Sequence, residues 1–144
     1  MIGLAAGLLL VPVLDQAVKL LVLRVLAPAS LALGPFGKLQ AVTSRIWLTH
    51  VGFRPNPAVV WCLWLLAAAS LTVLTGFFPS CGWFAGALLG GSLSHALETS
   101  LRGCVIDYVR LRFWPAFNIA DVAITVGALG LFVQLVITMI EAWP

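Results

Sequence analysis

The chain has 144 residues, of which 62% are hydrophobic and only 9% are charged, and its formal net charge is +3. Because a soluble domain carries about 25% charged residues, this composition excludes an ordinary water-soluble domain and indicates an integral membrane protein. The basic residues do not interleave with aromatic residues in a groove-like run, so the sequence gives no indication of nucleic-acid binding.

The first apolar segment covers residues 2–26 and is long enough to cross a membrane at about 1.5 Å per residue. Residues 30–56, which follow it, are mixed in character. Two short runs within them, 38–42 and 46–51, favour strands. We expect these runs to pair as a small hairpin, a surface β-element that lies on the membrane between the first and second spans.

Three more apolar segments follow. Residues 58–78 contain no charge, residues 83–101 become polar in their second half, and residues 119–142 form a last span that Asn118 can cap. Residues 102–118, between the last two spans, form a polar loop. The sequence therefore predicts an all-α membrane protein, a single domain with four transmembrane helices and the surface β-element between helices one and two.

Ionisable residues at membrane depth fall toward one end of this predicted bundle, because successive spans run in opposite directions. They are Asp15, Lys19, His95, Glu98 and Asp121, and the two long loops at the same end add His50 and Asp107. Such groups are costly unless they are paired or hydrated, so they are candidates for a functional site. Asp15 and Lys19 stand four residues apart in acid-first order, which favours a structural ion pair.

Asp107 and Asp121 are the strongest candidates for catalysis. Two carboxylates held close together cannot both ionise easily, so such a pair shares a proton. One aspartate can then activate a water molecule while the other protonates a leaving amine. Spacing alone also allows a structural interpretation, in which Asp121 helps to cap the last span and Asp107 lies in a hydrated loop.

A metal site is a weaker alternative. His95 and Glu98 are three residues apart, a spacing that can supply two ligands, and His50 with the aspartates could complete a cage. A hydrogen-bonded polar cluster is the more ordinary interpretation, and we expect neither a metal nor a cofactor. The three cysteines match no zinc or redox spacing, and in apolar surroundings we expect them to be small buried hydrophobic residues.

Three stretches of sequence carry a family resemblance: LDQAVK at 14–19, GALLGGSLSHALETSLRGCVIDY at 86–108 and FWPAFNIADVAITVG at 113–127. They resemble motifs of lipoprotein signal peptidase (signal peptidase II), the intramembrane aspartic peptidase of bacteria, and the resemblance runs over nearly the whole chain. It implies that Asp107 and Asp121 form a catalytic dyad and that Asn118 orients the site.

The resemblance also implies a substrate and surroundings. The substrate would be a prolipoprotein, cut before a cysteine that carries a diacylglyceryl group, and the surface β-element would hold the signal helix and acyl chains among membrane lipids. The protein would lie in the bacterial inner membrane with its site toward the extracytoplasmic face. All eight Lys and Arg fall on the side of the site, and the positive-inside rule alone would make that side cytoplasmic. Several of these basic residues lie on a helix or in the candidate site, so their number is a poor guide to orientation. We therefore follow the family and place the site on the extracytoplasmic side.

The sequence departs from the family's motifs at four positions. His50 and His95 stand where the family has asparagine, Glu98 stands in place of aspartate, and Thr99 stands in place of arginine. In the family these positions support the dyad and hold the substrate. Thr99 cannot make the contacts of an arginine, although Arg102, nearly one turn later, could replace it in part. The alternative is a non-catalytic protein on the same scaffold, one that binds a lipidated protein or serves as a subunit of a membrane complex.

Overall fold

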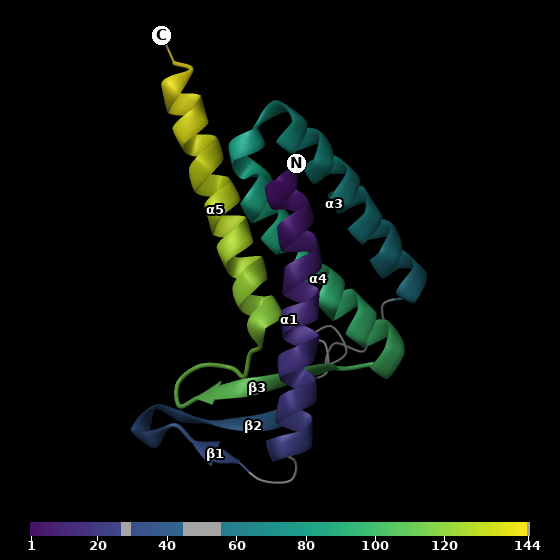
Figure 1. Cartoon of the computed structure of the whole chain (residues 1–144), viewed down its shortest axis with the longest axis vertical. Coiled ribbons are helices and arrows are strands. Elements are labelled where there is room, and N and C mark those ends of the chain that lie inside the picture. Colours follow the sequence, from purple (N-terminus) through teal and green to yellow (C-terminus); the bar gives the residue numbers. More distant parts are fainter. Residues whose placement is uncertain (27–29, 45–55, 144) are drawn as a thin grey trace.

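The computed structural model describes residues 1–26, 30–44 and 56–143, and four long helices dominate it (Figure 1). These helices are α1 (Ile2–Leu26), α3 (Pro57–Phe77), α4 (Gly82–Arg102) and α5 (Ile119–Glu141). They occupy the four segments that the sequence indicated as apolar. A small sheet lies at one end of the helices, and both chain termini lie toward the other (Figure 1).

Three of the described helices, α1, α3 and α5, are long and apolar enough to cross a membrane. The fourth, α4, is as long as α3, but glycine, serine and charged residues make its second half more polar. It packs against the other three helices and lies between them (Figure 1). Its polar side chains Ser94 and Glu98 are buried in these contacts. The structure thus supports three of the four expected spans by length and composition.

Glycines allow α4 to approach α1 closely. A Cβ atom on Gly86 would lie 2.6 Å from the carbonyl oxygen of Leu4, and one on Gly90 would lie 2.5 Å from that of Gly7. Neither distance is tolerable for a real side chain, so only glycine fits here. Small residues at helix contacts are typical of membrane bundles, where close backbone packing replaces the hydrophobic effect as the source of association.

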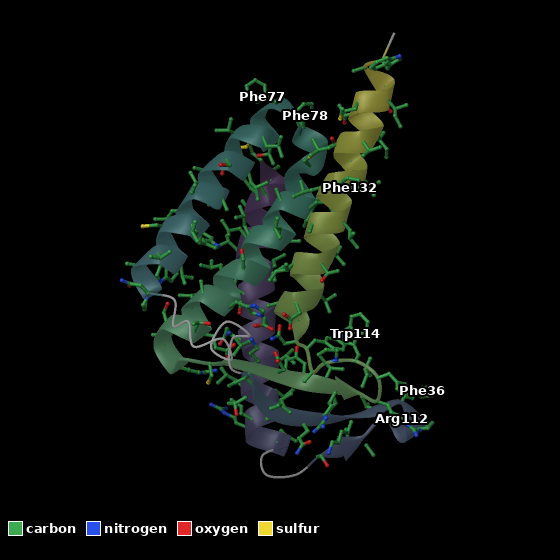
Figure 2. The ribbon with its side chains drawn as sticks, turned by 180° about the vertical axis from the view of Figure 1, so that it is seen from behind. Phe36, Phe77, Phe78, Arg112, Trp114 and Phe132 are labelled. Carbon is green, nitrogen blue, oxygen red and sulfur yellow. The ribbon has the colours of Figure 1, made fainter. Side chains whose placement is uncertain are left out.

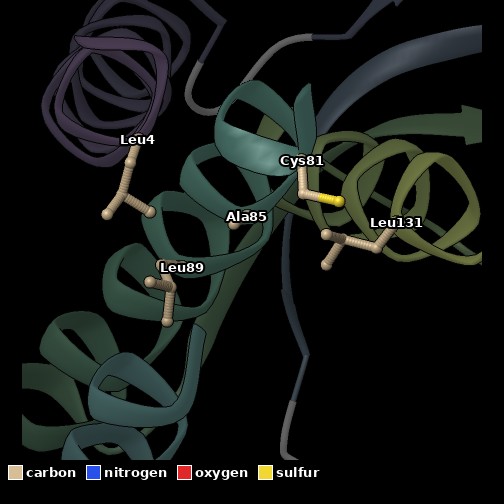
Figure 3. Packing of buried hydrophobic residues seen from close by; sticks show 5 residues of the cluster. All are labelled: Leu4, Cys81, Ala85, Leu89 and Leu131. Carbon is tan, nitrogen blue, oxygen red and sulfur yellow. The ribbon is translucent and has the colours of Figure 1, made fainter. Parts of the chain in front are cut away.

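A small apolar cluster lies where α1, α4 and α5 pack together (Figure 3). It consists of Leu4, Cys81, Ala85, Leu89 and Leu131. Cys81 is fully buried, as expected of a small hydrophobic residue, whereas Cys62 is exposed on α3 and Cys104 is half-buried. The expectation of three buried cysteines is therefore wrong for Cys62, because α3 contributes few buried residues to the bundle.

The sheet has the order β1-β2-β3, with β1 (Leu31–Ala32), β2 (Gly37–Ser44) and β3 (Val105–Leu111) all antiparallel. Short 3₁₀ helices cover Gly34–Phe36 and Pro79–Cys81. The expected hairpin partner, residues 46–51, lies outside the described residues. Within the described residues, β2 pairs with β1 and with β3. Because β3 lies in the segment 102–118 that was expected to be a polar loop, the expectation of a loop there is wrong. The first four residues of β3 are all buried, and this removes the alternation of polar and apolar residues by which a half-buried strand is predicted.

Gly103 connects α4 to β3. Its φ of 69° lies in the left-handed region, and its N–H donates a 2.9 Å hydrogen bond to the carbonyl oxygen of Thr99. This is a common way to end a helix, because glycine adopts that conformation without steric cost. The chain turns directly into β3, which carries Asp107 beneath the ends of the helices.

Candidate active site

Asn118 begins α5 and forms a reciprocal cap with Asp121. Its backbone is extended, with φ −134° and ψ −178°, and its side-chain oxygen accepts a 3.0 Å hydrogen bond from the N–H of Asp121. In return, Oδ2 of Asp121 accepts a 2.9 Å hydrogen bond from the N–H of Asn118. This capping box fixes the Asp121 carboxylate at the positive end of α5, where a negative charge is stabilised.

The same asparagine holds the second aspartate. Its Nδ2 donates a 2.7 Å hydrogen bond to Oδ1 of Asp107 and a 3.3 Å bond to the carbonyl oxygen of Ile106. Asn118 and Asp107 are only 1% and 6% exposed, whereas 39% of the Asp121 side chain is exposed. Asn118 thus bonds both carboxylates, that of Asp107 through its side-chain amide and that of Asp121 through its backbone N–H, and of the two carboxylates Asp121 is the more exposed.

His95, from α4, lies beside this cap. Its Nε2 is 3.3 Å from Oδ1 of Asn118 and 3.5 Å from Oδ1 of Asp121, and a quarter of its side chain is exposed. A neutral imidazole can donate to one of these oxygens, and a protonated one forms an ion pair with the carboxylate. His95 is therefore placed to orient the side chain of Asp121.

Tyr108 follows Asp107 on β3 and also supports the start of α5. Its hydroxyl oxygen accepts a 3.1 Å hydrogen bond from the N–H of Ile119. Burial raises the pKa of Tyr108 to about 12, and the negative charges of the nearby aspartates add to this, against a smaller opposing effect of the Ile119 N–H. The hydroxyl therefore stays protonated at any physiological pH.

A buried ion network lies beside the candidate dyad of Asp107 and Asp121. Nζ of Lys19 is 2.7 Å from Oδ2 of Asp15 and 2.6 Å from Oε2 of Glu98, and all three side chains are fully buried. Arg102, in turn, donates a 2.8 Å hydrogen bond to Oε1 of Glu98. Two carboxylates with two cations leave the cluster balanced in charge, which is the condition for burying such groups at tolerable cost.

Asp15 connects this network to the start of α5. Its Oδ2 accepts a 2.6 Å hydrogen bond from the hydroxyl of Ser94, and its Oδ1 accepts a 3.2 Å bond from the N–H of Ala120. Ala120 lies in the first helical turn, next to Asp121. The network thus joins α1, α4 and α5 directly behind the candidate dyad.

An apolar groove of about 430 Å³ opens beside His95, between α3, α4, β3 and α5. Trp64 forms part of its wall, and its Nε1 donates to the hydroxyl of Ser92 at 3.2 Å. Thr99 also faces the groove, whereas Arg102 is not among the lining residues and pairs with Glu98 instead. His95 is the lining residue that connects the groove to Asp121, because its Nε2 lies 3.5 Å from the Asp121 carboxylate.

The structure separates the residues that the sequence suggested as metal ligands. His95 faces Asn118 and Asp121, whereas Glu98 faces Lys19 and Arg102. Within residues 1–26, 30–44 and 56–143, no group of three or more His, Cys, Asp or Glu side chains is arranged to hold a metal ion. His50 lies outside these ranges.

Two supporting residues were not found by sequence reasoning. Tyr108 and Ser94 both contact the site through hydrogen bonds to groups far away in the chain. Ser94 lies in a helix rich in small residues and has no distinguishing pattern. The signal for Tyr108 was its place beside Asp107, and it becomes informative only once β3 is known to be a buried strand.

Comparison with known proteins gives one family. The family model for signal peptidase (SPase) II matches residues 7–137. A lipoprotein signal peptidase of Thermodesulfovibrio yellowstonii is 27% identical over 131 residues, which cover 84% of this chain and 86% of that protein. A lipoprotein signal peptidase of Cupriavidus pinatubonensis is 34% identical over 94 residues, covering 62% of this chain and 48% of that protein. The chain spans about half the length of several curated relatives that it matches.

Two solved structures share the fold. Both are described as bacterial membrane enzymes studied by the in meso method, one at 1.9 Å and one at 2.3 Å resolution. The first gives a TM-score of 0.75, covering 96% of this chain and 93% of that one, and the second gives 0.70, covering 95% and 87%. Sequence identity is 16% in both cases, so these likenesses bear on the fold alone.

Proposed function

Because the chain belongs to the signal peptidase II family, we propose that it is an aspartic endopeptidase that removes signal peptides from lipoprotein precursors. It cleaves before a cysteine that carries a diacylglyceryl group. The observation that supports this most strongly is the contact of Asn118 with both Asp107 and Asp121. A capping role alone would explain Asp121, but it would not explain why the same amide also binds a buried aspartate on a separate strand.

The two aspartates divide the chemistry in this proposal. Asp121 is partly exposed, lies at the positive end of a helix and accepts a backbone N–H, so it acts as the ionised partner and takes a proton from water. The water oxygen attacks the scissile carbonyl carbon. Asp107 carries the shared proton and delivers it to the leaving nitrogen as the C–N bond breaks. The products are a signal peptide with a new carboxylate and a lipidated cysteine with a free amino group.

The apolar groove beside His95 is the proposed site of the substrate. It brings an apolar chain to His95, whose Nε2 lies 3.5 Å from Oδ1 of Asp121, and a lipid-modified precursor requires an apolar surface of this kind near the dyad. We propose further that α4 crosses the membrane as a fourth span. Glu98 is buried against Lys19 and His95 faces Asn118, while the exposed Arg102 lies at the end of the helix. Ionisable residues paired inside a bundle or placed at a helix end are tolerated in a membrane.

The proposed location is the bacterial inner membrane, with the dyad toward the extracytoplasmic face. Both chain termini lie at the end opposite the sheet (Figure 1), so this placement puts both in the cytoplasm. A green fluorescent protein fused to the C-terminus should fluoresce, and alkaline phosphatase fused at the same position should be inactive. Active phosphatase at the C-terminus would reverse the proposed orientation.

The cleavage assay uses purified full-length protein in nanodiscs and a precursor that carries the diacylglyceryl-modified cysteine. Asp107→Asn and Asp121→Asn should each lower the rate by at least about 10²-fold, the usual contribution of a general acid or base. Glu141→Gln is the matched control, because Glu141 is an exposed acid at the far end of α5. Unchanged cleavage by either dyad variant, with the same folded signal as wild type, would contradict the proposal.

One feature favours a second candidate, a non-catalytic protein that binds a lipidated partner. Thr99 faces the groove and the guanidinium of Arg102 is engaged by Glu98, so the described groove wall offers the substrate little positive charge. The same assay decides between the two. Stable binding of the lipidated precursor without cleavage by the wild-type protein would support the scaffold.

A further inference from the structure

Two positively charged side chains lie side by side on neighbouring strands of the sheet. Their electrostatic repulsion is unfavourable unless an anion binds between them. Lys38 of β2 pairs directly with Arg110 of β3 in the antiparallel register, and directly opposed side chains lie on the same face. Arg112 lies in the turn directly after β3 and lines the same groove as Lys38 and Arg110, and its N–H donates a 3.1 Å hydrogen bond to the carbonyl oxygen of Phe36. Like charges in opposed positions destabilise a strand pair.

The acidic residues of the chain are engaged elsewhere. Of five in the sequence, Asp15 and Glu98 belong to the buried ion network, and Asp107 and Asp121 are bound by Asn118. Glu141 ends α5, at the end of the bundle away from the sheet. Among the described residues, no ion pair involves Lys38, Arg110 or Arg112. Their charge is therefore available to an anion from outside the chain.

The three cations line a groove that adjoins an apolar hollow. The groove has a volume of about 460 Å³, and Lys38, Arg110 and Arg112 contribute all of its charged lining. The hollow, of about 510 Å³, shares Pro35, Leu111 and Arg112 with it. Its other walls are aromatic, namely Phe36, Phe113 and Trp114.

The aromatic residues project from the molecule and do not fill its core. Phe36 is 75% exposed and Phe113 is 89% exposed. Figure 2 shows Phe36, Arg112 and Trp114 gathered at the outer end of the sheet, away from the helices. The Arg112 guanidinium lies over the Phe113 ring, 5.3 Å from its centre. Aromatic rings mixed with arginine are typical of a surface that enters the headgroup region of a bilayer.

We propose that this corner of the sheet binds an anionic phospholipid. We call it the sheet tip and define it by Lys38, Arg110, Arg112, Phe36, Phe113 and Trp114. The lipid phosphate binds in the cationic groove, and the glycerol and first acyl carbons bind in the apolar hollow next to it. A free anion would use the groove but not the hollow, so their continuity favours a lipid. Because β3 carries both Arg110 and Asp107, a lipid bound at the tip also holds the strand of the dyad at the membrane surface.

The test measures lipid binding and not cleavage, so it is independent of the proposed enzymatic function. Full-length protein in a neutral detergent is titrated with fluorescent short-chain phosphatidylglycerol and, separately, with fluorescent phosphatidylcholine. Wild type should prefer the anionic lipid. Lys38→Gln, Arg110→Gln and Arg112→Gln should each weaken phosphatidylglycerol binding on the order of fivefold, the usual effect of one basic residue near an anionic headgroup.

Arg24→Gln is the matched charge control, because Arg24 is exposed at the sheet end of α1 but is not part of the groove. It should leave binding within about twofold of wild type, since one distant charge is largely screened by salt. Phe113→Ala should weaken binding of both lipids without changing the preference. Circular dichroism and thermal unfolding confirm that each variant folds.

Three results would overturn the proposal. The first is equal affinity of the wild type for the two lipids. The second is an equal loss of binding in Arg24→Gln and in the groove variants, which would indicate general surface charge. The third is displacement of phosphatidylglycerol by millimolar inorganic phosphate together with no effect of Phe113→Ala, which would indicate a site for a soluble anion.

Discussion

Asn118 donates a 2.7 Å hydrogen bond from its side-chain amide to Oδ1 of Asp107, although the two residues lie on different elements, α5 and β3. The same side chain caps α5 and accepts the N–H of Asp121. The start of the helix and the middle of the strand are thereby held at one spacing. In a site where two acids must share a proton, that spacing determines whether the reaction can proceed.

Substitution of Asn118 should separate its two roles. Asn118→Ala removes the helix cap and the bond to Asp107, whereas Asn118→Ser keeps a side chain that can cap a helix but is too short to serve both aspartates. Both should lower cleavage on the order of 10²-fold, because preorganisation of the dyad is lost. The alanine variant should be less stable than the serine variant by about 1 kcal/mol, the typical contribution of a cap.

Asn56→Ala is the control for that experiment. Asn56 caps α3 by accepting a 3.0 Å hydrogen bond from the N–H of Ala58. It caps a different helix from the one that carries Asp121. Its loss should cost a similar free energy of unfolding, about 1 kcal/mol, with cleavage unchanged. Cleavage by Asn118→Ser at the wild-type rate would show that the bond to Asp107 has no catalytic importance.

The buried ion network should respond strongly to loss of its central cation. Lys19→Met leaves the carboxylates of Asp15 and Glu98 buried without their shared partner, which should lower the free energy of unfolding by roughly 3–5 kcal/mol. The added substitution Asp15→Asn should recover part of this loss, because it removes the charge left without a cation, whereas Glu98 keeps its 2.8 Å bond from Arg102. Chemical unfolding in detergent measures each step, and Arg24→Gln, exposed on the same helix, should change stability by less than about 0.5 kcal/mol.

The contact between α1 and α4 should not tolerate a single added methyl group. A Cβ on Gly86 would lie 2.6 Å from the carbonyl oxygen of Leu4, so the helices must move apart. Gly86→Ala should cost about 1–3 kcal/mol, as overpacking does elsewhere. The control is Gly76→Ala in α3, where nothing lies within 4 Å of the added atom; it should be neutral or stabilising by up to about 1 kcal/mol. Equal thermal stability of the two variants would refute the close packing.

Tyr108 offers a measurable titration, because it is the single tyrosine of the chain. Near-ultraviolet absorbance of tyrosinate should show a midpoint near pH 12, compared with the ordinary pKa of 10.0. The folded state then binds the tyrosine proton over a pH range in which the unfolded state has released it. Its contribution to stability is therefore complete below pH 10 and decreases as the pH rises toward 12.

Tyr108→Phe is the comparison that isolates this effect from the titration of lysines. The variant should lack the absorbance change and should show a weaker decrease of stability between pH 10 and 12. It should also be less stable at neutral pH, since the N–H of Ile119 loses its acceptor, at a cost of about 1–3 kcal/mol. A wild-type midpoint near pH 10 would contradict the buried position of the ring.

The sequence predicted the helical segments well, because each is a long apolar run with clear breaks at its ends. It also indicated that polar residues converge at one end, which follows from alternating helix direction alone. The ion pair of Asp15 and Lys19 was predicted because its partners are one turn apart. Glu98 was a candidate site residue, but its ion pair with Lys19 was not predicted. The two residues are 79 positions apart, and no local sequence pattern connects them.

The sequence alone thus determined the local features of the protein, namely the length of its apolar segments, their alternating direction, the helix caps and the contacts within one helical turn. The tertiary structure decided the pairing of β2 with β3, the contact of Asn118 with Asp107, and the cationic groove at the sheet tip. These depend on hydrogen bonds and packing between segments far apart in the chain. These contacts form only when the whole bundle assembles. The periodicity and composition of a single segment therefore cannot predict them.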